Sequence, residues 1–367
     1  MKVTGMRTIR VKVPFDQPIR TSIHHIDSIA CVLLYLDSDA GITGEGLVWA
    51  LGEGRLAVLD EMIHSLADRV VGQDPHRHAG IWGEMWREVN FYGHKGITLF
   101  GIGAIDMALW DMVGKAHGLS VCRLLGQSRE RVRAYHSGGL WVSLSTDELV
   151  AQAKDYVAQG YRAMKMRLGR PTVAEDAERV AAVRAAIPAG VELMADANQG
   201  FTVDHAIRLG RLLEAHELTW FEEPVQAYDL EGSARVAAAL DTPIASGETE
   251  YARYGFRDML ERKSADVLMP DLQRVGGITE FVKVAHMADA FDVPISPHVY
   301  TEQCLQLCGA LGNVRHTEYM PWFGALYNET IELVDGDFLV PDRPGLGFTF
   351  DEAAVAQFRL SDDGGSQ

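Results

Sequence analysis

The stretch LMADANQGFTVDHAIRLGRLLEAHELTWFEEP, residues 193–224, contains a short apolar run, a segment with helical periodicity and a second short apolar run. The same alternation continues on both sides. Residues 126–325 contain eight apolar runs in all, and each run but the last precedes a helical segment. Besides the two runs in this stretch, they are RVRAYHSGG, RAMKMRL, PIASGE, ADVLMPD, VPISPH and VRHTEY. Eight parallel strands with crossover helices are typical of a (β/α)8, or TIM, barrel. A doubly wound sheet is the competing α/β fold, but no glycine-rich dinucleotide fingerprint follows the first run.

The two ends of the chain follow different patterns. TIRVKV and ACVLLYLDS, followed by the turn DAGITGEG, predict a short antiparallel meander, and the apolar spacing from Arg55 to about Lys115 is helical. Strands followed by helices indicate an α+β module. LYNETIELVDGDFLVPDRPGLGFTF (326–350) again suggests strands and turns. We therefore predict an N-terminal α+β capping domain (1–125), a modified TIM barrel that carries the active site (126–325) and a C-terminal segment that returns to the cap (326–367).

Composition limits the classes of partner. The net charge of −17 disfavours nucleic acid, which is bound by clustered Lys and Arg. The four cysteines form no CxxC pair, so we expect buried thiols in a reducing compartment. The N-terminus lacks the apolar core of a signal peptide, and no apolar run reaches the roughly 18 residues of a membrane helix. These features predict a cytoplasmic protein that binds neither a membrane nor nucleic acid.

Polar residues interrupt the apolar runs near their C-terminal ends, where a barrel builds its active site. A buried parallel strand is otherwise nearly continuous in Val, Ile and Leu. The interrupting residues are Lys165, Arg167, Asp196, Asn198, Glu222, Glu248, Asp271, His298 and Glu318. From Asp196 onward the ionisable ones recur about every 20 to 27 residues, which is the length of one βα unit. Any single acid here could be a helix cap, but the period predicts side chains that converge on one centre.

Three carboxylates, on Asp196, Glu222 and Glu248, end consecutive predicted strands. Like charges so close would raise one another's pKa unless a cation lay between them. Oxygen ligands without cysteine favour Mg²⁺ over Zn²⁺. A two-metal hydrolase would present histidines instead, and the HxH of His76 and His78 is expected to be exposed at the start of a helix in the first module.

Asp271 and His298 end adjacent predicted strands across the expected centre. A carboxylate bonded to one imidazole nitrogen fixes the tautomer and makes the other nitrogen more basic. We therefore expect His298 to be a general base near neutral pH. A lone histidine would more often be a core residue with satisfied hydrogen bonds.

Two long motifs resemble the mandelate racemase/muconate lactonizing enzyme family of the enolase superfamily. GIGAIDMALWDMVGKAHGLSVCRLLG (101–126) is similar to the family's cap-to-barrel helix, and residues 193–224 resemble its metal signature, including the D-x-N and E-E-P elements. The resemblance implies one Mg²⁺ held by Asp196, Glu222 and Glu248. It also implies an Asp271–His298 dyad of the mandelate racemase subgroup, with Asn198 and Glu318 contacting the substrate.

The chemistry implied by this resemblance is removal of a proton α to a carboxylate, through an enediolate. Lys165 would be one of the groups that stabilise the developing charge. The second cation of the motif is commonly a lysine base in this family, but here it is Arg167, which stays protonated at ordinary pH. A racemase needs an acid/base on each face of the carbanion, whereas dehydration needs one. Arg167 could instead bind a substrate hydroxyl or a distal carboxylate.

We therefore predict a lyase, an acid-sugar dehydratase that converts an aldonic or aldaric acid to a 2-keto-3-deoxy acid. A racemase, epimerase or cycloisomerase is the alternative, and a non-catalytic sugar-acid binding protein is a remote one. Specificity is expected in the cap loops IRTSIHHIDS (19–28) and GLVWALGEG (46–54), where His24 and Trp49 are candidate substrate contacts. The family resemblance also implies a homo-oligomer.

Overall fold

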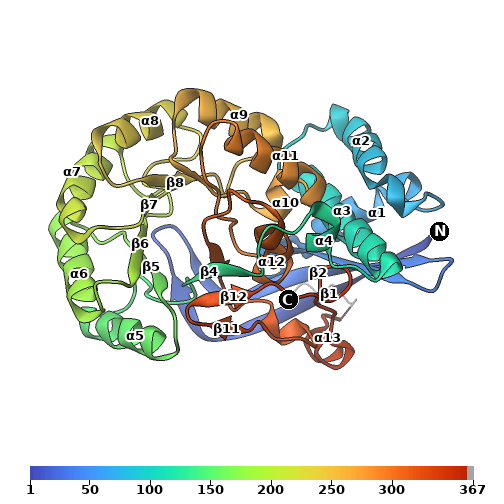
Figure 1. The fold of residues 1–367 in the computed structure, drawn as a ribbon, viewed down its shortest axis with the longest axis horizontal. Coiled ribbons are helices and arrows are strands. Elements are labelled where there is room, and N and C mark those ends of the chain that lie inside the picture. The colour runs from blue at the N-terminus through green and yellow to red at the C-terminus, as the bar shows by residue number, and fades with distance from the viewer. Residues whose placement is uncertain (362–367) are drawn as a thin grey trace.

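The computed structural model of the chain describes residues 1–361, and Figure 1 shows a small sheet and its helices packed beside a barrel. The small sheet is an antiparallel meander of three strands, β1 (Val3–Arg20), β2 (His25–Ser38) and β3 (Thr43–Leu51). Strand β2 is buried on both faces, and its alternation separates two cores. Val32, Leu34 and Leu36 pack into the core of the cap, whereas Leu33 and Tyr35 pack into the core shared with the barrel.

Helices follow this sheet in the chain, and those at residues 56–64 and 97–117 pack against it. Their bounds are η1 (Glu53–Arg55), α1 (Leu56–His64), η2 (Ala67–Arg69), η3 (Pro75–Arg77), α2 (His78–Glu88), η4 (Val89–Phe91), α3 (Ile97–His117) and α4 (Val121–Leu125). Helix α3 approaches strand β3 closely, because a Cβ added at Gly46 would lie 2.3 Å from the carbonyl oxygen of Ala104. The absence of a side chain at Gly46 therefore permits this backbone contact.

Helix α3 also corrects one expectation from the sequence. By length and composition it could cross a membrane, although we expected no segment of that kind. In the fold, 83% of its most apolar window is buried inside the protein. Helix α3 is therefore a core helix, and it lies between the cap sheet and the barrel (Figure 1).

The barrel confirms the predicted order of strands and helices. Its strands are β4 (Arg131–His136), β5 (Ala163–Arg167), β6 (Glu192–Asp196), β7 (Phe221–Glu222), β8 (Ile244–Ser246), β9 (Val267–Leu268) and β10 (Thr317–Tyr319). The outer helices are α5 (Thr146–Ala158), α6 (Val173–Ala186), α7 (Val203–Leu213), η5 (Glu214–His216), α8 (Leu230–Ala239), α9 (Ala252–Arg262), α10 (Leu272–Val275), α11 (Ile278–Asp289) and α12 (Thr301–Ala310). These strands pair in parallel from β4 to β9, and β10 pairs with β4.

The seventh apolar run is not a regular strand. It bridges its neighbours at single positions, from Ile295 to Leu268 and Val314, and from His298 to Asp271. Proline has no N–H to donate, so Pro294 and Pro297 on this run interrupt a continuous ladder. The run still occupies the seventh place in the barrel.

The C-terminal segment contacts the barrel before it reaches the cap. It contains η6 (Gly324–Leu326), β11 (Leu333–Val334), β12 (Asp337–Leu339) and α13 (Glu352–Phe358). Strand β12 pairs antiparallel with β4 of the barrel. Further on, Phe350 N donates to Glu45 of β3, and Leu360 N donates to Arg10 O of β1. The capped barrel is thus confirmed, while the domain boundaries at 125/126 and 325/326 stay a prediction.

Candidate active site

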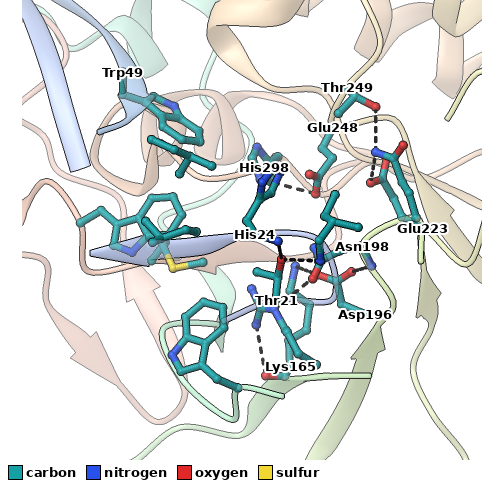
Figure 2. A pocket seen from close by; sticks show the side chains of 18 of the residues that line it. Thr21, His24, Trp49, Lys165, Asp196, Asn198, Glu223, Glu248, Thr249 and His298 are labelled. Atoms are coloured by element: carbon teal, nitrogen blue, oxygen red, sulfur yellow. Dashed lines mark hydrogen bonds and ion pairs between the residues drawn. The ribbon is translucent and has the colours of Figure 1, made fainter. Parts of the chain in front are cut away.

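A cavity opens beside the C-terminal ends of the barrel strands, beneath loops of the cap (Figure 2). Its wall brings together most of the side chains that the sequence singled out: Lys165, Arg167, Asp196, Asn198, Glu248 and His298 from the barrel, and His24 and Trp49 from the cap. Three other candidates, Glu222, Asp271 and Glu318, lie behind this wall and contact residues that form it.

Lys165 is buried in the middle of a cluster of carboxylates. Its Nζ atom lies 2.5 Å from Glu222 Oε1, 3.0 Å from Glu318 Oε1 and 3.6 Å from Asp196 Oδ2. Burial alone would lower the pKa of Lys165, but the three carboxylates raise it above the usual value. In this conformation Lys165 is therefore a protonated side chain that is ion-paired with carboxylates, and not a free base.

Arg167 is likewise committed to protein partners. Its Nη1 and Nη2 atoms donate to the backbone oxygen and the hydroxyl of Ser137, each at 2.9 Å, and the guanidinium lies 4.5 Å from the ring centre of Trp141. Its Nε faces Asp196 Oδ2 at 3.4 Å. The guanidinium fork that could have bound a distal carboxylate is thus turned toward Ser137.

The turn after β6 orients Asp196 and Asn198. Asp196 Oδ1 accepts the N–H of Asn198 at 2.7 Å, and Oδ2 accepts the side-chain amide of Asn198 at 3.1 Å. Asn198 adopts a left-handed conformation with φ 44°, which asparagine tolerates better than most residues. Its Oδ1 is buried without a hydrogen-bond partner, so it is available to a ligand.

The E-E-P element presents its two acids differently. Glu222 accepts hydrogen bonds from Lys165 and from the indole of Trp220, whereas Glu223 lines the cavity and accepts one from Gln199 at 2.8 Å. Glu223 adopts φ 37°, an unusual conformation for a residue with a Cβ. Glu223 was not singled out from the sequence, and a regular strand would point its side chain away from that of Glu222.

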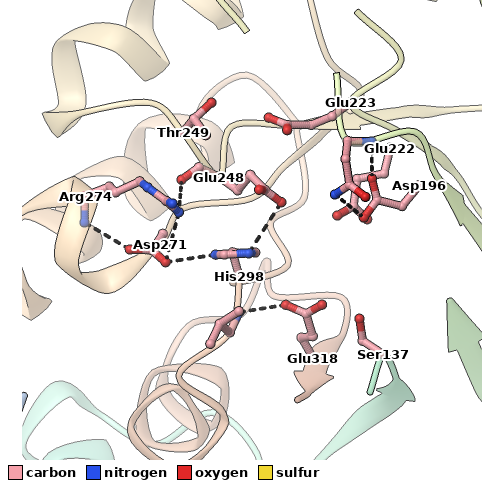
Figure 3. Close-up of polar contacts among 12 residues, drawn as sticks. Ser137, Asp196, Glu222, Glu223, Glu248, Thr249, Asp271, Arg274, His298 and Glu318 are labelled. Atoms are coloured by element: carbon pink, nitrogen blue, oxygen red, sulfur yellow. Dashed lines mark hydrogen bonds and ion pairs between the residues drawn. The ribbon is translucent and has the colours of Figure 1, made fainter. Parts of the chain in front are cut away.

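The Asp271–His298 dyad is present as the sequence predicts (Figure 3). Asp271 Oδ2 lies 2.8 Å from His298 Nδ1, and Asp271 Oδ1 caps α10 by accepting the N–H groups of Gln273 and Arg274 at 3.0 Å each. Because a carboxylate accepts the Nδ1 proton, Nε2 of neutral His298 carries a lone pair. This nitrogen faces the cavity and lies 3.5 Å from Glu248 Oε2.

The surroundings of His298 favour its protonated form. Burial alone lowers the pKa of an imidazole, but Glu248, the hydrogen bond to Asp271 and the charge of Glu318 together raise the pKa of His298 above the usual value. A raised pKa is what is expected of a histidine base that is paired with a carboxylate.

Glu318 does not reach the cavity in this conformation. Its Oε2 accepts the N–H of Val299 at 2.7 Å, and its Oε1 pairs with Lys165. Burial raises the pKa of a carboxyl group, but Lys165, His298 and Arg167 outweigh burial and lower the pKa of Glu318. Its expected contact with a substrate carboxylate stays a prediction.

The cap closes the cavity from above. Trp49 is buried against His298, with ring centres 6.3 Å apart, and its Nε1 lacks a hydrogen-bond partner. His24 lines the cavity from an exposed loop, and the preceding Ser22 ties this loop to the barrel by donating to Ala197 O at 2.7 Å. Residues 21–24 thus form a loop within the first predicted cap segment, whereas the second predicted loop, residues 46–54, is mostly strand β3, which carries Trp49.

Several lining residues were not foreseen from the sequence. They are Thr21, Ile23, Ile26, Leu51, Trp141, Gln199, Glu223, Thr249, Arg274, Met320 and Trp322. The sequence could have indicated Arg274, because it lies one helical turn after Asp271. In the structure its Nη1 reaches both Glu248 O and the Asp271 carboxylate. No sequence pattern indicates Trp322, since its place depends on the irregular loop after β10.

The oxygen donors at this site fit a hard divalent ion. Within residues 1–361, no three His, Cys, Asp or Glu side chains form a ready-made metal-ligand group. However, Asp196, Glu223 and Glu248 share the cavity wall, and Glu223 Oε1 is buried without a hydrogen-bond partner. Burial raises the pKa of Glu222 to about 8, although Lys165 opposes the shift, and the neighbouring carboxylates of Asp196, Glu318 and Glu248 add to it. Glu222 would have to exchange Lys165 for the ion in order to bind it.

Sequence families match both parts of the chain. Residues 3–126 match the mandelate racemase/muconate lactonizing enzyme N-terminal domain, and residues 148–354 match the family described as enolase C-terminal domain-like. The two matches together span the cap and the barrel.

Individual relatives are similar over nearly the whole chain. L-Talarate/galactarate dehydratase of Salmonella typhimurium is 36% identical over 332 residues, which cover 90% of this chain and 82% of that enzyme. D-Galactarolactone cycloisomerase of Agrobacterium fabrum is 34% identical, covering 99% of this chain and 100% of that enzyme. The crystal structure of L-talarate dehydratase from Polaromonas sp. JS666, complexed with Mg and L-glucarate, superposes with a TM-score of 0.93 at 34% identity over 98% of each chain.

Proposed function

The chain belongs to the mandelate racemase/muconate lactonizing enzyme family of the enolase superfamily, and we propose that it dehydrates an acid sugar by removing the α-proton and then eliminating the 3-hydroxyl group. The observation that carries this proposal is the Asp271–His298 dyad, which presents Nε2 to a cavity whose other side is rich in carboxylates. The product would be a 2-keto-3-deoxy acid.

His298 is the base in this proposal. Asp271 accepts the Nδ1 proton and stabilises the imidazolium that forms when Nε2 takes the α-proton of the substrate. Asp271 is itself fixed by the two backbone N–H groups of α10, so the imidazole ring cannot turn freely. The same imidazolium is placed to return its proton to the departing hydroxyl group, which leaves as water.

Mg²⁺, when bound, would stabilise the negative charge that develops on the substrate carboxylate as the proton leaves. We propose Asp196, Glu222 and Glu248 as its ligands, with Asn198 contacting the substrate beside them. Lys165 Nζ would donate to the substrate carboxylate. Glu318, whose Oε1 lies 3.0 Å from Lys165 Nζ, would be its counter-charge.

A second base is what a racemase would need on the opposite face of the substrate. Among residues 1–361, the cations on β5 are poor candidates, because Lys165 is paired with Glu318 and Arg167 is bound to Ser137. Arg167 instead contributes its charge to Asp196, so we propose that it positions this carboxylate. One base is sufficient for dehydration.

Cycloisomerisation is the second candidate, because a full-length relative of 34% identity is named D-galactarolactone cycloisomerase. That chemistry also needs a single base, so the site geometry does not separate the two outcomes. The substrate panel must therefore include sugar-acid lactones as well as free aldonic and aldaric acids.

Proton NMR in D₂O tests the proposal directly. The Mg²⁺-loaded protein is mixed with each acid of the panel, and the α and β proton signals are followed. Loss of both signals with a new 2-keto-3-deoxy product supports dehydration, and a ring-opened or isomeric product supports cycloisomerisation. Inversion at the α-carbon without net loss would mean that a second base exists.

His298→Asn is the matched variant for this assay. It should lose both turnover and α-proton exchange, because Nε2 is the proposed proton acceptor. Full activity of this variant would overturn the mechanism while leaving the family assignment intact.

We also propose that the protein is a cytoplasmic homo-oligomer that binds neither a membrane nor nucleic acid. All four cysteines are buried and unpaired, which suits a reducing compartment. Phe91 and Tyr92 are 92% and 81% exposed, and they lie in the chain between Trp86 and His94, which line a surface groove together with Tyr228 and Tyr254. Aromatic side chains are frequent anchors of interfaces. Light scattering after gel filtration measures the mass, and a strictly monomeric protein would contradict this proposal.

A further inference from the structure

Two histidines and an aspartate meet on the surface of the cap, outside the active site. His76 lies in η3, between Asp74 and α2, and His117 is the last residue of α3. His76 Nε2 and His117 Nε2 are 2.9 Å apart, and His76 Nδ1 lies 2.7 Å from Asp74 Oδ1. The sequence had drawn attention to His76 through the HxH pattern, but its partner is His117, 41 residues away. His78 instead packs its ring on Trp110, with ring centres 4.2 Å apart.

The hydrogen bonds define which nitrogens are available. Asp74 accepts the Nδ1 proton of His76, so Nε2 of neutral His76 carries a lone pair. His117 therefore donates its own Nε2 proton to that lone pair. A carboxylate behind a histidine in this way is the arrangement that orients imidazole ligands in many metal sites.

The backbone holds both histidines in place. Asp74 also accepts the N–H of His76 at 3.1 Å, which caps the short η3 helix. Gly118 ends α3 in a left-handed conformation, and its N–H and that of Leu119 bond back to the last turn. The two imidazoles thus project from two rigid segments that are distant in the sequence.

We propose that Nε2 of His76 and Nε2 of His117 form a binding site for one divalent transition ion, with Asp74 orienting His76. Two imidazole nitrogens bound to one ion at about 2.0–2.1 Å lie about 2.9–3.4 Å apart at square-planar or tetrahedral angles. The observed 2.9 Å lies at the lower end of this range. Both side chains are on the surface, so small rotations can turn the two lone pairs toward one ion.

Ion binding replaces the hydrogen bond between the rings without removing a proton from the protein. His117 moves its proton from Nε2 to Nδ1, which frees the Nε2 lone pair, and His76 keeps its Nδ1 proton on Asp74. Within residues 1–361 no further His, Cys, Asp or Glu completes the set, so water fills the other positions. Imidazole ligands select Cu²⁺, Ni²⁺ or Zn²⁺ over Mg²⁺, and Cu²⁺ should bind most tightly.

Two of the local charges favour a cation at this place. Asp74 is a carboxylate in direct contact with one ligand, and the C-terminal end of α3 carries the negative end of the helix dipole. The N-terminal ammonium also acts on Asp74 and opposes a cation, whereas Lys115 is engaged with Asp111 at 2.6 Å. A bound ion would tie the segment before α2 to the end of α3, and so brace the cap.

Copper titration of the Mg²⁺-saturated protein, followed by electron paramagnetic resonance, tests the site. Excess Mg²⁺ competes with Cu²⁺ for the oxygen ligands of the active site, and the hyperfine pattern counts coordinated imidazole nitrogens. Wild-type protein should bind one Cu²⁺ through two imidazoles. His76→Gln and His117→Gln should each weaken binding at least about tenfold and leave one imidazole, and Asp74→Asn should weaken it about 10–100-fold.

His64→Gln is the matched control, because His64 is an exposed cap histidine that also lies near a carboxylate, Asp60, at 3.5 Å. This variant should keep the two-imidazole spectrum. A wild-type spectrum with one imidazole, or unchanged binding in His117→Gln, would overturn the proposal. These outcomes do not depend on the dehydratase activity, which is measured separately.

Discussion

Replacing Asp271 by asparagine should inactivate His298 by fixing the wrong tautomer. In the native site, Asp271 Oδ1 accepts two backbone N–H groups, from Gln273 and Arg274, and Oδ2 accepts the Nδ1 proton of His298. The asparagine oxygen is needed by the two backbone donors, so its NH₂ group must face His298. An NH₂ group donates, so His298 Nδ1 must then accept, and Nε2 carries the proton. A protonated Nε2 on a neutral ring cannot remove the α-proton.

The cost of recovering the active tautomer follows from the same contacts. Turning the amide over would set its NH₂ against the two backbone donors, and each buried donor left unpaired costs about 1–3 kcal/mol. Arg274 Nη1, 3.4 Å from Asp271 Oδ2, favours the turned amide only weakly, because it also donates to Glu248 O. A penalty of about 2–6 kcal/mol corresponds to a rate loss of about 30-fold to 10⁴-fold.

Deuterium exchange at the α-carbon, followed by NMR, measures this loss without requiring elimination. Asp271→Ala is the informative comparison, because alanine leaves Nδ1 of His298 without a partner and lets the ring adopt either tautomer. We expect Asp271→Ala to exchange faster than Asp271→Asn, although alanine also removes the cap of α10. If the asparagine variant were as active as wild type, or faster than the alanine variant, the tautomer argument would be refuted.

Three further predictions concern stability. Lys165→Met should lower the free energy of unfolding by about 3–5 kcal/mol in Mg²⁺-free protein, because it leaves buried carboxylates unpaired, and by less in saturating Mg²⁺. Equal losses in urea titrations under both conditions would contradict an ion among these carboxylates. Gly46→Ala should cost about 1–3 kcal/mol or more through the clash with α3, whereas Gly54→Ala, with open space around it, should be nearly neutral in thermal unfolding. Burial raises the pKa of Asp106 to about 7, above its unfolded value, so its protonation stabilises the fold at low pH and this contribution is lost as pH rises through 7. Relative to Asp106→Asn, wild type should therefore lose stability between pH 5 and 7.5 in urea titrations, and a constant difference would contradict the assignment.

The barrel could be predicted because most of its apolar runs are interrupted by a polar residue near the C-terminal end. The period of these residues places Asp196, Glu248 and His298 around one opening, and the structure brings all three into the cavity wall. The dyad of Asp271 and His298 followed from the same spacing. Neighbouring strands fix such positions through the backbone alone, so the sequence pattern was sufficient.

The spacing of polar residues in the sequence could not predict which side chains pair with one another. Spacing indicates that Glu222 and Glu318 point toward the centre, but not that Lys165 holds both of them away from the cavity. Arg167 was expected to meet a ligand, yet Ser137, from the neighbouring β4 end, takes its guanidinium. Such choices depend on distances between strands, which a single sequence does not contain.

The contacts between the C-terminal segment and the first strands also affect how the protein folds during synthesis. Leu360 donates to Arg10 O, and Phe350 donates to Glu45, so the first module receives these hydrogen bonds from residues translated much later. During synthesis the N-terminal sheet must therefore wait for these contacts until residues 350–360 have left the ribosome. Contacts that join the two ends of a chain form slowly and leave intermediates exposed to aggregation. A premature stop shortly before residue 350 should therefore harm folding of the part made first.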